Sequence, residues 1–267
     1  MTNRSRILWA CAALALGAQT PAFAWPGSNC KYTAQRVATL PVNGAKRIVI
    51  RVGPGDLVVR GVKSGAAVTA HGKACAPTED QLAKTAIDIS RDGDSVLIAT
   101  AIPTAKSRPG TLWGTAEPYI DVEIDLPAEI PISLDDGPGD ARVINIAGGT
   151  IRDTSGDLTI DGVSGDLDVV DSSGDINING VGGKLSMDDS SGDINIRNVK
   201  GAVLIRNDSS GDINVTNAGA DVTIANDSSG DVDINGVGGS FTLGNKGSGE
   251  VSVHGVQGQV KIPDYKQ

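Results

Sequence analysis

The sequence predicts an all-β protein: a single-chain parallel β-solenoid, or β-helix, built from two-strand coils of about 18–19 residues, with irregular N-terminal capping coils. Three observations support this fold. A unit of 17–19 residues recurs seven times, apolar and polar residues alternate within each unit, and glycine-rich turns separate the alternating segments. Glycine is abundant, at 35 of 267 residues, and aromatic residues make up only 3%, as expected for many short strands joined by tight turns.

The N-terminus has the features of a secretory signal peptide, which we expect to occupy residues 1–24. Arg4 and Arg6 form a positive segment, residues 7–18 are a short apolar run, and Ala22-Phe23-Ala24 is a small-x-small cleavage signal. The run is too short to span a bilayer. A lipoprotein reading at Cys11 would leave almost no apolar run before the cysteine, so it is disfavoured. We therefore expect an exported protein that is periplasmic, at the cell surface or secreted.

Two cysteines, Cys30 and Cys75, remain after cleavage behind Ala24. In an oxidising compartment an even pair predicts one disulfide. The alternative, a metal site that also uses His71, lacks a fourth ligand.

The mature chain would be strongly acidic. Removing Arg4 and Arg6 leaves 21 of the 23 basic residues against 32 acidic ones, so the net charge becomes 21 − 32 = −11. Such a chain repels phosphate backbones and anionic lipid headgroups, which argues against nucleic-acid and membrane-surface partners. No further segment is apolar enough to predict a transmembrane span.

The repeat divides the mature chain into irregular β coils with a cap (25–135) and regular solenoid repeats (136–267), the second continuous with the first. The regular units start at Asp136, Asp153, Asp171, Asp189, Asp208, Asp227 and Lys246. Each unit reads as turn, strand, turn, strand, with about five apolar side chains, too few for a core of its own. Stacking the coils at about 4.8 Å would align these side chains into continuous buried columns.

Alternation shows which side of each strand is buried. Every second residue of the first strand is apolar and the residue between is polar, which is the period of a half-buried strand. The two apolar columns are Leu158, Ile176, Ile194, Ile213, Val232, Val251 and Ile160, Ile178, Ile196, Val215, Ile234, Val253. Glycines such as Gly174, Gly180 and Gly183 mark bends that need a positive φ or a close approach of backbones.

The irregular region contains weaker copies of the same pattern. Residues 53–62 echo 137–140 and the strand that follows, residues 66–70 read as a second strand, and 120–126 alternate cleanly. Thr78 followed by Gln81 resembles a capping box and predicts a short helix near 79–86. Asp92-Gly93 predicts a hairpin, and residues 103–117 a loop around Trp113. This region is expected to cap the first edge of the solenoid.

Two acidic columns are the candidate site. They are Asp136, Asp153, Asp171, Asp189, Asp208, Asp227 and Asp140, Asp157, Asp175, Asp193, Asp212, Asp231, Glu250. The favoured reading is turn capping, in which each carboxylate accepts N–H groups of its own turn and solvent screens the rest. The alternative is calcium held between coils by carboxylates and carbonyls. Its candidate ligands are Asp171, Asp175, Asp189, Asp193, Asp208, Asp212, Asp227 and Asp231.

No catalytic residues are assigned. Acid–base pairs occupy singular positions with unlike environments, whereas these aspartates are repeated and equivalent. The leading hypothesis is a non-enzymatic envelope or surface module whose partner is a protein or a glycan. The alternatives are a carbohydrate-active β-helix enzyme, a glycosidase or lyase that uses repeat aspartates, and a calcium-stabilised binding scaffold.

A resemblance supports the leading hypothesis. The leader, Gly55-Asp56-Leu57-Val58-Val59, Ile124-Asp125-Leu126-Pro127 and the repeated Ser-Gly-Asp-Ile-Asn-Ile units resemble a bacterial β-strand-repeat family of unknown function labelled "putative adhesins". The similarity covers essentially the whole mature chain. It implies an exported solenoid with a surface or envelope role and provides no catalytic residues.

Overall fold

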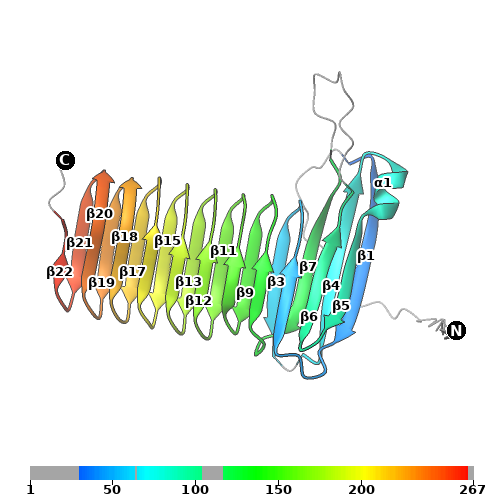
Figure 1. Ribbon diagram of the computed structural model, residues 1–267, viewed down its shortest axis with the longest axis horizontal. Helices are drawn as coiled ribbons and strands as arrows, with labels where there is room; N and C mark the ends of the chain where they lie inside the picture. Colours follow the sequence, from blue (N-terminus) through cyan, green and yellow to red (C-terminus); the bar gives the residue numbers. More distant parts are fainter. Residues whose placement is uncertain (1–29, 64, 104–116, 264–267) are drawn as a thin grey trace, which may run out of the picture.

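The computed structural model describes residues 30–63, 65–103 and 117–263, which form a long rod of two facing sheets and one short helix (Figure 1). Each sheet has 11 strands within these residues. In stacking order, the first sheet contains β1 (Tyr32–Pro41), β4 (Ala67–Ala76), β7 (Tyr119–Pro127), β3 (Leu57–Val62), β9 (Ala141–Ile146), β11 (Leu158–Val163), β13 (Ile176–Val181), β15 (Ile194–Val199), β17 (Ile213–Ala218), β19 (Val232–Val237) and β21 (Val251–Val256). The second contains β22 (Val260–Lys261), β20 (Phe241–Ser248), β18 (Val222–Ser229), β16 (Val203–Asn207), β14 (Leu185–Asp188), β12 (Leu167–Val170), β10 (Gly149–Arg152), β8 (Ile132–Asp135), β2 (Arg47–Arg51), β6 (Ser95–Ala101) and β5 (Ala86–Asp92).

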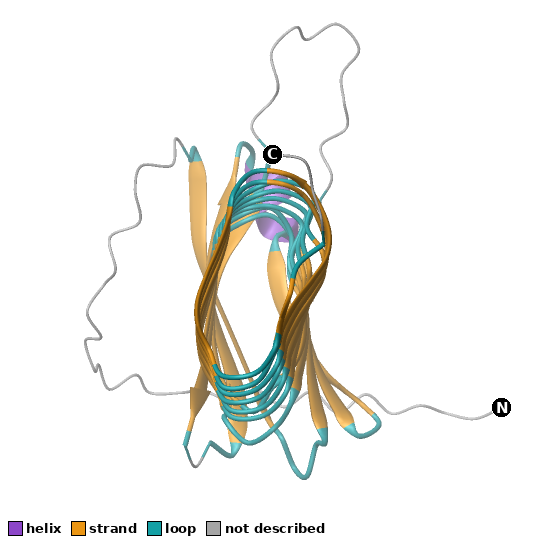
Figure 2. Cartoon of the chain, turned by 90° about the vertical axis from the view of Figure 1, so that its left-hand side faces the viewer, coloured by secondary structure: helices purple, strands orange, loops and turns teal. Residues whose placement is uncertain are grey.

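The regular coils stack in parallel and in register, as the repeat predicts. Ile176 of β13 pairs with Ile194 of β15, and Ile194 pairs with Ile213 of β17. All three side chains are fully buried. Viewed along the rod, the coils superpose as a flattened tube whose two long walls are the sheets (Figure 2). Full burial of each such side chain contributes about 1.5–3 kcal/mol, so the columns are the main source of stability.

Two turn positions require a left-handed or extended positive φ. At one, the residue is either glycine or asparagine, with φ values of +80° at Gly180 and +59° at Asn198, because these residues tolerate that region best. At the other, Gly174 and Gly192 have φ near +130°. There a Cβ on Gly192 would lie 1.9 Å from the carbonyl oxygen of Gly174. The bends expected at Gly174 and Gly180 are confirmed, and Gly183 approaches the backbone of Asp166 closely.

We expect Gly192→Ala to lower the free energy of unfolding by about 3 kcal/mol, because it combines a strained φ with a backbone clash. Gly180→Ala is the matched control. It also needs a positive φ, but its Cβ would meet no atom closer than 3.7 Å, so about 1 kcal/mol is expected. Urea unfolding of both variants measures the difference. Equal losses would show that the φ angle alone, and not the close stacking of coils, constrains position 192.

The N-terminal coils do not stack in chain order. The coil formed by β2 and β3 lies between the β6–β7 coil and the β8–β9 coil. Its backbone is bonded to a segment far along the chain: Gly55 N donates to Pro138 O at 3.0 Å and Leu57 N to Asp140 O at 2.9 Å. The sequence similarity between residues 53–62 and 137–140 is therefore a similarity between segments that lie in adjacent coils. We call the β2–β3 coil, inserted in this way, the interlock.

Beyond the interlock the rod ends in antiparallel structure, which the repeat does not predict. β4 pairs antiparallel with both β1 and β7, and β5 with β6. The expected helix is α1 (Glu79–Lys84), with Thr78 as its N-cap accepting from Gln81 N. The expected hairpin joins β5 to β6 at Asp92-Gly93. The loop around Trp113 lies outside the described residues, apart from its flanks.

The structure contains the expected disulfide between Cys30 and Cys75, whose Cα atoms are 5.7 Å apart. It fastens the start of β1 to the end of β4. At the other end of the rod the last coil is less well covered, with Val260 and Ile262 exposed. Within the described residues no helix has the length and apolarity needed to cross a membrane. The signal peptide predicted for residues 1–24 and its cleavage site lie outside them, as do Asp264 and Lys266.

Candidate functional site: stacked aspartate columns

Six aspartates form a buried column at the same edge of the second sheet; five directly follow a strand, and Asp227 lies within the longer strand β18. One comes from each of six successive coils, and each is only 1–5% exposed: Asp136, Asp153, Asp171, Asp189, Asp208 and Asp227. The backbone holds them in register. Asp171 N donates to Asp188 O, immediately before Asp189 of the next coil, at 3.0 Å, and the bond recurs from coil to coil. We call this set the buried aspartate column.

Turn capping, the favoured expectation, is present at four of the six positions, and neither carboxylate oxygen of Asp208 or Asp227 accepts a turn N–H. One carboxylate oxygen of Asp171 accepts from Ser172 N at 2.7 Å, and Asp189 accepts from Ser190 N at the same distance. The expectation that solvent screens the remaining charge is wrong here, because the side chains point into the turn and are covered by neighbouring coils. The second oxygen of Asp136, Asp153, Asp171 and Asp189 is buried without a hydrogen-bond partner.

Burial, helped at most positions by repulsion from other carboxylates, favours the protonated form of five of these side chains. Burial raises the pKa of Asp136 to about 8, and the carboxylates of Asp153 and Asp56 add to the rise. Burial raises the pKa of Asp208 to about 7, with contributions from Asp189 and Asp227. The pKa values of Asp153 and Asp189 rise to about 6 for the same main reason, and that of Asp171 also rises. Turn N–H groups oppose these shifts because they stabilise the ionised form.

A lysine closes the column at the C-terminal end. Lys246 pairs in register with Asp227, so it stands where the next aspartate would be. Its ammonium lies 2.9 Å from Asp227 Oδ2, and both side chains have no solvent exposure. The same ammonium donates to the carbonyl oxygens of Gly230, at 2.5 Å, and Ser248. The sequence shows a lysine at this repeat position, but only the register reveals its pairing with the preceding coil.

The second acidic column lies on the outside of the turn. Asp157, Asp175, Asp193, Asp212 and Asp231 are exposed. One oxygen of each accepts the backbone N–H of the equivalent residue in the next coil. For example, Asp193 N donates to Asp175 at 3.0 Å, and Glu250 N donates to Asp231 at 2.8 Å. These aspartates therefore link neighbouring coils instead of capping their own turns, which explains how a column of like charges is tolerated.

The calcium candidates are consequently divided between two environments. Asp171, Asp189, Asp208 and Asp227 are buried, whereas Asp175, Asp193, Asp212 and Asp231 are exposed. In the described part of the chain no three carboxylate, imidazole or thiol groups gather into a metal-binding cluster. Any cation between coils would thus depend on two carboxylates and on carbonyl oxygens.

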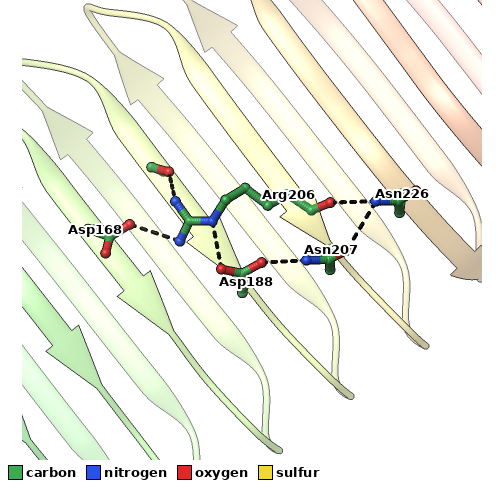
Figure 3. Close-up of polar contacts among 6 residues, drawn as sticks. Asp168, Asp188, Arg206, Asn207 and Asn226 are labelled. Atoms are coloured by element: carbon green, nitrogen blue, oxygen red, sulfur yellow. Dashed lines mark hydrogen bonds and ion pairs between the residues drawn. The ribbon is translucent and has the colours of Figure 1, made fainter.

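Sequence reasoning missed an ionic network on the outer face of the second sheet (Figure 3). Arg206 Nε lies 2.6 Å from Asp188 Oδ2, its Nη2 lies 3.0 Å from Asp168 Oδ1, and its Nη1 donates to Ser186. One guanidinium thus joins three successive coils. The register between β14 and β16 shifts at this point. The lengthening of the coils from 18 to 19 residues was the sequence signal of this bulge.

Asparagine side chains continue the network along the rod. Asn207 Nδ2 donates to Asp188 Oδ1 at 2.8 Å, and Asn226 Nδ2 donates to Asn207 Oδ1 at 3.1 Å (Figure 3). Asn245 extends the row to the following coil. Stacked amides satisfy one another at the coil spacing, so this row stiffens the edge of the second sheet.

Structural comparison finds similarity to several solved proteins, three of which follow. A "putative cell adhesion protein" from Clostridium sporogenes is 16% identical, with 84% of this chain and 99% of that chain covered and a TM-score of 0.39. A "putative adhesin" from Bacteroides fragilis is 17% identical, with 86% and 97% covered and a TM-score of 0.34. A "putative lipid binding protein" from Parabacteroides distasonis is 13% identical, with 85% and 97% covered and a TM-score of 0.38. These values are too low to transfer a function.

Comparison with curated proteins gave no match. The family described as Toastrack DUF4097 matches residues 122–263, just over half of the chain and all of its regular coils. The match covers the parallel repeats and both aspartate columns. The chain therefore belongs to the Toastrack DUF4097 family.

Proposed function

We propose that this protein is an exported, non-enzymatic interaction module of the cell envelope, adhesin-like in that a rigid rod presents a repeated surface to a protein or glycan. The observation that carries the proposal is the outward column of the first sheet. Its residues are held in register at the strand spacing: Thr159, Asn177, Asn195, Asn214, Asp233 and Ser252. A rigid row of amide, hydroxyl and carboxylate groups can bind an extended partner at several points without a large loss of entropy.

The Cys30–Cys75 disulfide supports the proposed compartment, because disulfides persist in oxidising environments. The leader expected at residues 1–24 gives the same location.

The outer aspartates favour binding over catalysis. A glycosidase needs two carboxylates with different environments, one protonated and one ionised. Here Asp157, Asp175 and Asp193 make the same bond to the next coil and share the same exposure. Their equivalence suits a structural ladder.

Cosedimentation with isolated bacterial sacculi and outer-membrane vesicles tests the proposal. We expect the purified protein to sediment with one of them, and Asn195→Arg with Asn214→Arg to weaken this at least tenfold, because both side chains would obstruct the outward column. Thr223→Arg with Thr242→Arg, on the second sheet, is the matched control and should bind normally. Binding that neither pair affects would contradict the assigned face. Polysaccharide turnover abolished by Asp175→Asn or Asp193→Asn would replace the binding role with an enzymatic one.

A further inference from the structure

The end of the buried aspartate column shows how this turn binds a positive charge. The Lys246 ammonium contacts three oxygen groups: the Asp227 carboxylate and the carbonyls of Gly230 and Ser248. It is fully buried, so the protein supplies the counter-charge for Asp227 from its own chain. Buried carboxylates need such a partner, since an unpaired buried charge is costly.

Equivalent oxygen atoms recur in the earlier coils, where no lysine stands at the repeat position of Lys246. Asp208, Gly211 and Ser229 occupy in their turn the positions of Asp227, Gly230 and Ser248 one coil later. Gly211 N donates to Ser229 O, as Gly230 N does to Ser248 O, so the backbone arrangement is also repeated. In these coils the position of Lys246 holds another aspartate. Buried carboxylate oxygens without a hydrogen-bond partner occur along this row, one each in Asp136, Asp153, Asp171 and Asp189 and both in Asp208.

We propose that the buried aspartate column binds calcium between adjacent coils, with each ion held by two aspartate carboxylates and by carbonyl oxygens of the turns. Oxygen-only donors suit a hard cation. Calcium–oxygen distances are about 2.3–2.6 Å, so an ion midway between two oxygens spans about 4.6–5.2 Å, which matches the coil spacing of about 4.8 Å. Magnesium, at about 2.0–2.1 Å, spans too little.

Charge sets the expected number of ions. Lys246 neutralises Asp227, which leaves five carboxylates: Asp136, Asp153, Asp171, Asp189 and Asp208. Each divalent ion that bridges two of them neutralises that pair, so about two ions fit the five, with one carboxylate left to bind a proton. This site is independent of the proposed envelope role, because its ligands face the inside of the rod.

Calorimetric titration of the chelator-stripped protein with calcium chloride at pH 8 tests the proposal. We expect about two ions per chain and a rise of about 5–10 °C in Tm at a hundredfold excess over Kd. Magnesium chloride, and potassium chloride at matched ionic strength, should shift Tm by less than about 1 °C. Asp171→Asn with Asp189→Asn should remove about one ion, whereas Asp175→Asn with Asp193→Asn, in the exposed column, should bind as the parent does.

A second variant covers the case in which the buried substitutions prevent folding. Lys246→Met releases Asp227 and makes six carboxylates available, so the number of bound calcium ions should rise from about two to about three. The proposal is overturned if calcium does not bind, if magnesium or potassium stabilises equally, or if the exposed-column variants lose calcium instead. An unchanged number of ions in Lys246→Met would also overturn it.

Discussion

Raising the pH from 4 to 9 in a chelating buffer is expected to lower the free energy of unfolding by about 5 kcal/mol. The cause lies in five members of the buried aspartate column, whose folded-state pKa values lie above the ordinary value of 3.8 and reach about 8 at Asp136 and about 7 at Asp208; the other three are Asp153, Asp171 and Asp189. The folded chain therefore retains protons that the unfolded chain has released. The stabilisation is complete below pH 4, is lost progressively as the pH rises towards 8, and changes little above that.

The magnitude follows from the two largest shifts. A tenfold change in proton affinity corresponds to about 1.4 kcal/mol. Asp136 and Asp208 together would give about 10 kcal/mol, and coupling between neighbouring carboxylates reduces this to about half, since protonation of one lowers the repulsion on the next. Urea unfolding at intervals of one pH unit measures the curve.

An amide substitution provides the control for this pH dependence. Asp208→Asn cannot ionise, so we expect it to be close to the parent at pH 4 and more stable than the parent at pH 8. Asp193→Asn, in the exposed column, should follow the parent curve throughout. Stability that increases between pH 5 and 8 in the parent would show that the buried carboxylates are ionised and well compensated, contrary to the argument from burial.

Lys246→Met is expected to lower the free energy of unfolding by about 4 kcal/mol at pH 8 without calcium, because it leaves Asp227 buried without its counter-charge. Methionine keeps the length of the side chain, so the loss measures charge and hydrogen bonding more than packing.

A double variant separates the ion pair from the fold. In Lys246→Met with Asp227→Asn neither partner is charged, and most of the stability lost at pH 8 should return. Lys200→Met, at an exposed lysine in the same solenoid, should change stability by less than about 0.5 kcal/mol. If the double variant is no more stable than Lys246→Met, then Lys246 acts by filling space and not by pairing.

Much of the fold follows from the sequence because its columns are redundant. Ile176, Ile194 and Ile213 recur at a fixed interval with polar neighbours, and only parallel stacking in register buries all of them. The direction of side chains in the turns is harder to predict from the sequence. Period-two alternation fixes the direction of side chains within a strand, but Asp171 follows the end of a strand, where the direction depends on the turn itself. Its burial was therefore not predictable.

Two further features depend on contacts that no local pattern encodes. Arg206 reaches Asp168 two coils away, and neither residue type nor spacing signals that contact. The stacking order of the N-terminal coils is likewise not signalled by any local sequence pattern. The similarity of residues 53–62 to residues 137–140 is visible in the sequence. Whether two similar segments lie in adjacent coils depends, however, on the path of the chain between them. Asp140 N donates to Asp56 across 84 residues of sequence.

Because of the interlock, the two ends of the rod differ in whether coils can be gained or lost. After β9 each coil touches only the coil before it and the coil after it in the chain, so one repeat can be gained or lost there while its neighbours close the gap. The β2–β3 coil is different, because its two neighbours are made from later segments of the chain. An added coil on that side would have to be accommodated by the connections on both sides of it. Extension and shortening are therefore confined to the part of the molecule that follows β9, and the disulfide-bonded end remains constant.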